Sequence, residues 1–320
     1  MRYLVTGGAG FIGSHLVDAL LARGEQVVCL DNFNDYYSPA RKRRNIANAL
    51  EQPGYTLVEA DFREPAALEH VFTTHRPQRI AHLGAMANAR YSVHHAPLYV
   101  QTNVAGTVAL LELARKYGVE NFLLASTSSV YGSSPTPWHE ELSADRPLSP
   151  YAASKRSAEL HAFTYAHLYG LPTTVVRFFT VYGPRGRPDM TPYLFVHNMV
   201  RGKPFTLFNG GENLYRDYTY VSDIVAGVVA ALDAMLPFEI INLGNERPIL
   251  MQQFVRLLEQ ITGHKALIDS VPMPTTEPPI TFADTTKAQR LLGYRPQTNV
   301  EQGLSHFWQW YCKEEMQNDR

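Results

Sequence analysis

The sequence has little cysteine and no long apolar run. Its two cysteines, Cys29 and Cys312, cannot form a disulfide framework, and their spacing matches no cysteine-based metal motif. The longest charge-free apolar run near the middle of the chain, residues 224–232, is far shorter than the ~18 residues that cross a bilayer. The first residues form a short β-like run that ends in glycines, which fits no signal peptide. We therefore expect a protein of the reducing cytoplasm that makes no membrane contact.

A strong charge of either sign is also missing. The chain has 29 Lys and Arg against 30 Asp and Glu, so no general field holds nucleic acid or an anionic membrane surface. We interpret the dense basic run at residues 41–44 as a solvated helix face. The histidines do not have the spacing of a zinc motif at positions His94, His95, His161 and His167. We therefore expect neither nucleic acid nor a metal, and we favour a small-molecule ligand.

Short β-branched or apolar runs alternate with helix-period segments along the first 178 residues. Such alternation predicts parallel strands joined by helical crossovers that cover both faces of a sheet. The first crossover shows one apolar stripe between Phe11 and Leu20 before Gly24 ends the helix. We therefore predict an α/β fold with a Rossmann-type doubly wound parallel sheet. The predicted strands are residues 3–6, 26–30, 56–59, 79–83, 122–126 and 174–178.

The pattern changes after about residue 178, where Gly and Pro turn signals become frequent. We expect residues 1–177 to form the nucleotide-binding domain. Residues 217–243 contain one more helix and strand that return to the same sheet. Residues 178–216 and 244–320 then form a smaller, irregular α/β domain that binds the substrate.

A glycine-rich loop at residues 6–13 lies between the first strand and the first helix. A diphosphate needs bare backbone N–H groups at a helix N-terminus, and Gly7 and Gly10 keep side chains away from it. Gly13 lets the helix approach the strand. Asp31 ends the second strand 18 residues later, where its carboxylate can accept hydrogen bonds from a ribose diol and repels a 2′-phosphate. The pattern predicts NAD, the alternative being an unoccupied tight turn.

Tyr151 and Lys155 follow Pro150, which opens a helix, so they share one helix face. They stand after Thr127, at the carboxyl end of the fifth predicted strand, where open α/β sheets bind ligands. A phenol acts as a base near neutral pH only if its pKa falls by ~3 units, about 4 kcal/mol, and the Lys155 ammonium and a nicotinamide ring supply that. The Thr127 hydroxyl is expected to take part in the same proton transfer. A purely structural Tyr–Lys pair is the alternative.

Together with segments farther along, these motifs resemble the extended short-chain dehydrogenases/reductases that act on nucleotide sugars, over almost the whole chain. Segments 31–37, 90–92 and 177–190 are most similar to UDP-glucuronate 4-epimerases. One departure is Gly84, where that family usually carries alanine near the cofactor diphosphate. The NAD site is expected to comprise Gly7, Gly10, Phe11, Ile12, Gly13, Asp31, Asn32, Asp61, Phe62, Leu83, Gly84, Ala85, Asn103, Tyr151 and Lys155.

The resemblance implies a first step in which Tyr151 takes the proton of the sugar 4-hydroxyl while the hydride at carbon 4 passes to NAD. Similar dehydratases have an Asp-Glu pair after the catalytic Ser or Thr, and related decarboxylases have a Glu in the same tract. This chain has Ser128 and Ser129 there. Without an added acid or base, we expect the 4-keto sugar to rotate and take the hydride back on its other face, which is epimerisation.

The expected substrate is a UDP-hexuronate, because Arg185 offers a planar fork for a carboxylate and Thr180 replaces an Asn that is common in galactose-type epimerases. The alternative is that these charges only hold their own Gly- and Pro-containing loop together by ion pairs among Arg185, Arg187 and Asp189. The resemblance implies that Arg216 contacts the diphosphate of the nucleotide sugar. The alternative is a surface ion pair between Arg216 and Asp217. The expected substrate site comprises Arg90, Thr127, Ser128, Tyr151, Thr180, Arg185 and Arg216.

Conversion of UDP-glucuronate into UDP-galacturonate by a homodimer is therefore the expected function. The first alternative is a 4-epimerase of a neutral UDP-hexose or UDP-N-acetylhexosamine. A nucleotide-sugar decarboxylase or dehydratase, and a non-catalytic NAD-binding sensor on the same fold, also stay open.

Overall fold

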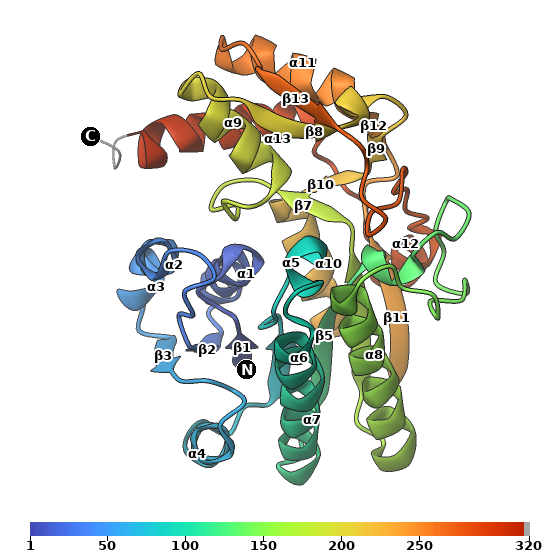
Figure 1. The fold of residues 1–320 in the computed structure, drawn as a ribbon. Coiled ribbons are helices and arrows are strands. Elements are labelled where there is room, and N and C mark those ends of the chain that lie inside the picture. The colour runs from blue at the N-terminus through green and yellow to red at the C-terminus, as the bar shows by residue number, and fades with distance from the viewer. Residues whose placement is uncertain (317–320) are drawn as a thin grey trace.

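A parallel sheet with helices on both faces forms the centre of the molecule (Figure 1). The computed structural model describes residues 1–316, and within them the sheet has seven strands in the order β11-β6-β5-β4-β1-β2-β3. This is the predicted doubly wound fold, and each of the six strands predicted in the first 178 residues is present with bounds within about one residue. The strands are β1 (Arg2–Thr6), β2 (Gln26–Asp31), β3 (Tyr55–Glu59), β4 (Arg79–His82), β5 (Asn121–Thr127), β6 (Thr173–Phe178) and β11 (Phe238–Leu243).

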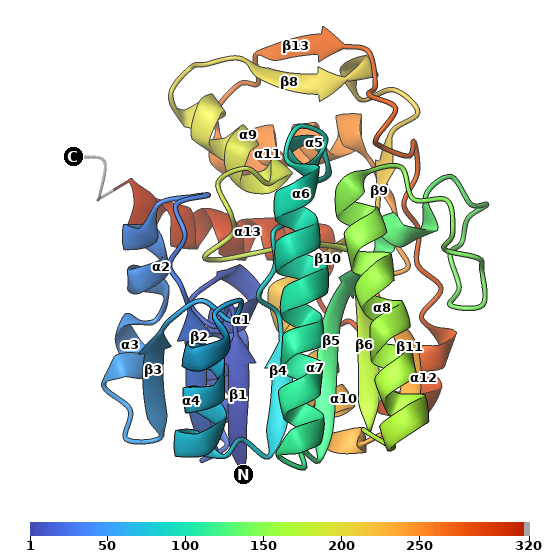
Figure 2. The same ribbon diagram turned by 60° about the horizontal axis from the view of Figure 1, so that its bottom comes forward.

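Two layers of helices bury the two faces of the sheet, as Figure 2 shows. One layer has α1 (Phe11–Ala22), α10 (Val221–Ala234) and α12 (Thr286–Leu292), and the other has α4 (Pro65–His75), α7 (Gly106–Lys116) and α8 (Pro150–Tyr169). Successive residues of a strand face opposite layers, so Tyr3 and Val5 pack in one core and Leu4 in the other. No helix within the described residues is long and apolar enough to cross a membrane.

Short strand pairs and three further helices lie over the carboxyl ends of the large sheet (Figures 1 and 2). The helices are α9 (Thr191–Val200), α11 (Met251–Thr262) and α13 (Val300–Trp310). The strand pairs are β7 (Thr180–Tyr182) with β10 (Tyr218–Tyr220), β8 (Phe205–Phe208) with β13 (Ile268–Val271), and β9 (Tyr215–Arg216) with β12 (Ile249–Leu250). The return to the large sheet therefore begins at α10, whereas residues 217–220 pair with β7. The expected division into domains otherwise stays a prediction.

The basic run at residues 41–44 is not a fully solvated helix face, and that interpretation was wrong. It lies on α2 (Pro39–Asn45), which precedes α3 (Ala47–Leu50), and both Arg41 and Lys42 are buried. Arg41 donates to the Glu315 carboxylate near the other end of the chain, and Lys42 donates to the main-chain oxygen of Asn34 at 2.8 Å. A contact so distant in the sequence leaves no local signal.

Helix α8 is fixed at its start and in its middle. The Ser149 hydroxyl accepts a hydrogen bond from the Ala152 N–H at 3.2 Å, and Pro150 occupies the first turn, as the sequence predicts. Farther along, Glu159 pairs with Arg177 of β6, with Oε1···Nε and Oε2···Nη2 distances of 2.9 and 2.7 Å. The first contact sets where Tyr151 begins, and the second holds the helix against the sheet.

Candidate active site

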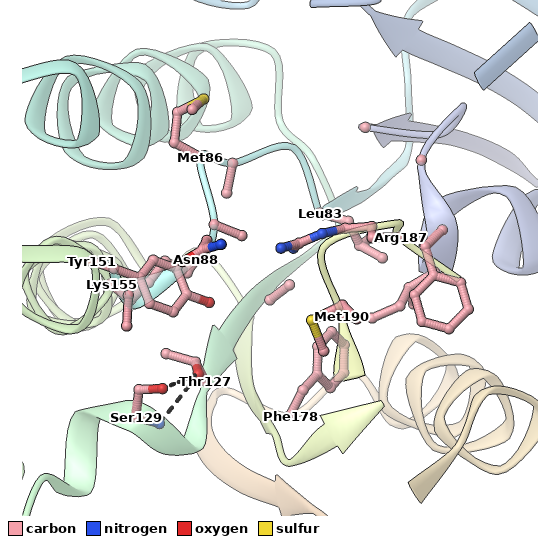
Figure 3. A pocket seen from close by; sticks show the side chains of 18 of the residues that line it. Leu83, Met86, Asn88, Thr127, Ser129, Tyr151, Lys155, Phe178, Arg187 and Met190 are labelled. Atoms are coloured by element: carbon pink, nitrogen blue, oxygen red, sulfur yellow. Dashed lines mark hydrogen bonds between the residues drawn. The ribbon is translucent and has the colours of Figure 1, made fainter. Parts of the chain in front are cut away.

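A cleft of roughly 610 Å³ opens where the parallel strands end and extends beneath the smaller α/β part. The segments that follow β1, β2, β4 and β5 contribute to its wall, as do residues of β7, β9 and β10. The carboxyl edge of an open α/β sheet is where such folds bind ligands. Figure 3 shows Tyr151, Lys155, Thr127 and Arg187 around this space.

The glycine loop forms one end of the cleft. A Cβ on Gly13 would lie 2.1 Å from the Gly7 main-chain oxygen, so only glycine lets α1 approach the loop this closely. Gly7 has φ +68, a left-handed conformation that favours glycine. Gly10 precedes the first turn of α1 and has no side chain that could cover the helix N-terminus. The loop therefore presents a bare backbone surface of the kind that accepts a diphosphate.

Asp31 and Asn32 continue the wall beyond the glycine loop. The buried Asp31 carboxylate accepts hydrogen bonds from the N–H groups of Ala9 and Phe33 at 3.1 and 2.9 Å. Burial raises the pKa of Asp31, and the Lys42 ammonium and the two N–H groups oppose that effect. Asn32 donates to Asp61 at 2.9 Å, so the ends of β2 and β3 are joined here. This places an oriented carboxylate beside the glycine loop.

Gly84 departs from the family pattern for a local reason. A Cβ there would come within 2.9 Å of the Phe62 ring and 3.1 Å of the Thr6 hydroxyl oxygen. The phenyl ring thus fills the volume that an alanine methyl group would take. Leu83, Gly84 and Ala85 all line the cleft, as expected.

Asn103 does not lie on the cleft surface. Its Oδ1 accepts from the Met86 N–H at 2.8 Å, and its Nδ2 donates to the Met86 oxygen and the Ser154 hydroxyl, both at 2.9 Å. These contacts use its donors and its acceptor, so it holds the segment after β4 against α8. Its expected contact with the cofactor stays a prediction.

Tyr151 and Lys155 project from one face of α8 toward Thr127 at the end of β5 (Figure 3). Burial raises the pKa of the Tyr151 phenol, and a hydrogen bond from Thr127 and the Arg187 guanidinium lower it. Burial lowers the pKa of Lys155 to about 8, and Glu159, one turn farther along, opposes that fall. We expected Lys155 to depress the phenol pKa, but in the protein alone burial dominates and Arg187 supplies the opposing positive charge.

Arg185 is not in the cleft, which corrects its expected role. Its guanidinium pairs with Asp18 of α1 at 2.7 Å, and its φ of +61 turns the side chain away from the site. Arg187 lines the cleft instead, and its guanidinium points into the space near Tyr151 (Figure 3). From the sequence, Arg187 was expected only to pair with Asp189 within its own loop. The two residues do pair, yet Arg187 also faces the cleft.

Arg216 lines the cleft from β9, Thr180 does so from the start of β7, and Ser128 does so directly after β5. The Arg216 guanidinium pairs with Glu277 at 3.4 Å, whereas Asp217 accepts from the N–H groups of Asn245, Glu246 and Ala283. A surface pair of Arg216 with Asp217 is therefore wrong. Arg90 lies at the rim, exposed, 5.6 Å from the Phe208 ring centroid.

Known proteins are similar to this chain over nearly its whole length. The chain matches the family described as GDP-mannose 4,6 dehydratase over residues 4–307. It is 41% identical over 309 residues to a UDP-glucuronate 4-epimerase of Thermodesulfobacterium geofontis, covering 96% of this chain and 95% of that protein.

Solved structures give the same fold. A UDP-glucuronic acid 4-epimerase from Bacillus cereus, in complex with UDP-glucuronic acid and NAD, is similar with a TM-score of 0.93 and 34% identity, covering 98% of this chain and 99% of that one. The dTDP-glucose 4,6-dehydratase DesIV from Streptomyces venezuelae, crystallised with NAD, has a TM-score of 0.92 and 31% identity, covering 99% and 98%. One fold thus carries two reactions, and the residues of the site must separate them.

The buried Lys155 should make the protein less stable at neutral pH than it would be with an uncharged side chain. Because folding lowers the Lys155 pKa from 10.5 to about 8, the unfolded chain binds more protons between these values, and this cost fades as the pH rises through that window. We expect Lys155→Met to raise the free energy of unfolding at pH 7 by about 2–3 kcal/mol, and most of that gain to be gone by pH 10. Urea unfolding at both pH values measures it.

The matched control is Lys265→Met, at a position whose side chain is 86% exposed, and its unfolding midpoint should not change. A Lys155→Met protein that gains nothing at pH 7 would contradict the claim that burial disfavours this ammonium.

Proposed function

Because the chain belongs to the family described as GDP-mannose 4,6 dehydratase, we propose that it is an NAD-dependent 4-epimerase that converts UDP-glucuronate into UDP-galacturonate. This membership confirms the family resemblance that the motifs predicted. The observation that carries the proposal is what one cleft brings together. It has the glycine loop at one end, Tyr151 with Lys155 and Thr127 in its wall, and the guanidinium of Arg187 near the phenol.

The residues present fit NAD. The bare loop around Gly10 suits the diphosphate, and Asp31 with Asn32 suits the ribose diol. Asp61 and Phe62 line the same end of the cleft beyond the ribose position. When bound, NAD accepts the hydride of sugar carbon 4 and later returns it.

Tyr151 moves the proton in this mechanism. Its phenolic oxygen takes the proton of the sugar 4-hydroxyl and gives it back after the 4-keto sugar has rotated. The Thr127 hydroxyl donates a hydrogen bond that lowers the pKa of the phenol, and Lys155 lies on the same face of α8 as Tyr151. Since burial raises the phenol pKa, the Thr127 donor and the Arg187 charge are what makes the base usable.

Dehydration needs an acid for the carbon-6 hydroxyl and a base for the carbon-5 proton, and the tract after Thr127 supplies neither. Ser128 and Ser129 stand there and both line the cleft. Neither hydroxyl is acidic or basic enough near neutral pH for that step. Return of the hydride to the rotated ketone is the route that this site leaves open.

The uronate carboxylate is best placed against Arg187 and Thr180. A guanidinium matches a carboxylate in charge and shape, and Arg187 is the one that the cleft holds near Tyr151. Thr180 at the start of β7 and Ser128 directly after β5 add hydroxyl donors. Arg216, which now pairs with Glu277, and Arg90 at the rim are left for the nucleotide diphosphate.

A homodimer is supported by the outward side of α8. Leu160 and Leu168 are 51% and 60% exposed there, and the adjoining π-helical segment η1 (Val100–Ala105) exposes Val100 to 55%. Exposed apolar side chains of this size on neighbouring helices favour burial against a second copy. Our expectations of a cytoplasmic location and of no nucleic acid or membrane partner stay predictions from the composition.

Tyr151→Phe should keep the fold and bound NAD but lose turnover of UDP-glucuronate by about 10²- to 10⁴-fold, because no phenolic oxygen remains to take the proton. Thr127→Ala should lose less. Initial rates and the NAD released on denaturation are the measurements. Near-normal turnover by the Tyr151→Phe protein would remove Tyr151 from the mechanism.

A deuterium label should show that the hydride is returned to the sugar from which it was taken. UDP-glucuronate deuterated at carbon 4, incubated without added NAD, should give UDP-galacturonate that keeps the deuterium, because one NAD both takes and returns it. NMR of the products, with a parallel assay for carbon dioxide, checks this. Faster conversion of UDP-glucose or UDP-N-acetylglucosamine than of UDP-glucuronate would assign the protein to the neutral-sugar epimerases instead.

Charges on α8 should separate the dimer. We expect the double variant Leu160→Glu/Leu168→Glu to elute as a monomer in size-exclusion chromatography with light scattering, because four like charges would face one another across the contact. Leu50→Glu, at a 54% exposed leucine on α3, is the matched control and should stay dimeric. A dimeric α8 variant would place the contact elsewhere.

A further inference from the structure

Arg187 is held by Asp189, the acidic residue of its own loop. Its Nε donates to Asp189 Oδ1 at 3.0 Å, and its Nη2 donates to Oδ2 at 2.7 Å. Both side chains are mostly buried, with 19% and 26% of their surfaces exposed. The pair is therefore bidentate and shielded, the geometry in which a charge-assisted contact best fixes direction.

Asp189 is itself fixed by two segments from other parts of the chain. Its Oδ2 accepts from the Tyr36 hydroxyl after β2 and from Asn88 Nδ2 after β4, both at 3.0 Å. The Asn88 amide cannot turn freely, because its Oδ1 accepts from the N–H groups of Arg90 and Tyr91 at the start of α5 (Ala89–Ser92). We call Tyr36, Asn88, Arg187 and Asp189 the Asp189 cluster.

The cluster keeps Asp189 ionised. Burial alone would raise the pKa of this carboxyl, but the Arg187 guanidinium and the hydrogen bonds from Asn88 and Tyr36 bring it to about 2. Its negative charge also faces the same space as Arg187, so it weakens the attraction that a bound uronate would feel. The Asp189 carboxylate opposes binding of the uronate, yet three donors hold it in place. This combination points to a role in orienting Arg187.

Only one edge of the guanidinium remains for a ligand. An arginine can grip a carboxylate in two-point fashion along its side edge, Nε with Nη2, or along its terminal edge, Nη1 with Nη2. Asp189 occupies the side edge, and Nη1 has no hydrogen-bond partner among residues 1–316. Figure 3 shows the guanidinium directed toward the space beside Tyr151 and Asn88. The orientation of the terminal edge is thereby set before any ligand arrives.

We propose that Asp189, held by Tyr36 and Asn88, is the positioning residue that fixes the terminal edge of Arg187 against the uronate carboxylate, an inference that rests on the proposed epimerase function. The 4-keto intermediate is a β-keto acid. If its C5–C6 bond aligns with the ketone π system, that bond breaks, its electron pair passes to the carbonyl oxygen as an enolate, and carbon dioxide leaves. Carbon 5 then takes a proton. A fixed Arg187 keeps the carboxylate out of that alignment.

The test is Asp189→Asn, which keeps the size of the side chain and removes its charge. Because carboxylate attraction persists and orientation is lost, kcat for epimerisation of UDP-glucuronate should fall about 10- to 100-fold, while KM stays within about threefold. A UDP-pentose should appear among the products by NMR. Tyr36→Phe, which removes one of the donors to Asp189, should change kcat and pentose in the same direction by less.

Tyr117→Phe is the matched control, because Tyr117 also donates its hydroxyl to a carboxylate, that of Glu69, far from the cleft at the end of α7. It should leave kcat, KM and products unchanged. An Asp189→Asn enzyme with normal kcat, or one whose kcat, melting temperature and retained NAD fall together without pentose, would overturn the proposal. Wild-type protein that is inactive on UDP-glucuronate would instead remove the proposed function and this inference with it.

Discussion

The ion pair between Glu159 and Arg177 sets the geometry of the site. It joins α8, which carries Tyr151 and Lys155, to β6, whose end leads into Thr180 and the Arg187 loop. The Ser126 hydroxyl donates to the same carboxylate from β5, one residue before Thr127. The Glu159 and Arg177 side chains are 0% and 1% exposed, so removal of Glu159 would leave the buried Arg177 charge without its partner. One contact thus keeps Tyr151, Thr127 and the Arg187 loop in register.

The parts of the site that the sequence predicted depend on short spacings. Parallel strands, the glycine loop, Asp31 and the Tyr151–Lys155 pair follow from local periodicity and from the rule that strand ends meet at one edge. Arg187 could not be separated from Arg185 in this way, because the left-handed φ of Arg185 and its pairing with Asp18 decide which guanidinium turns inward. The contacts of Asn103 and Arg41 within the protein could not be predicted for a related reason. Their partners, Ser154 and Glu315, are distant in the sequence.

Each buried or half-buried carboxylate that lines the cleft within the described residues already has a partner. Asp31 accepts two N–H groups, Asp61 pairs with Arg63, Asp189 with Arg187, and Glu277 with Arg216. A carboxylate held in this way is a poor proton donor or acceptor for a substrate, because its lone pairs are engaged. These carboxylates therefore do not supply the acid and base that dehydration requires, and the tract after Thr127 does not supply them either.

Loss of carbon dioxide from a 4-keto uronate needs no acid, so the pairing of these carboxylates does not guard against it. What remains is geometry, namely the angle between the C5–C6 bond and the ketone. That angle is set by the group that holds the carboxylate, and a guanidinium on a flexible side chain would let it vary. The Asp189 cluster removes that freedom through two segments of the cofactor-binding half, the loops after β2 and β4. Chemical selectivity in this site thus depends on contacts that join its two parts, and not on Arg187 alone.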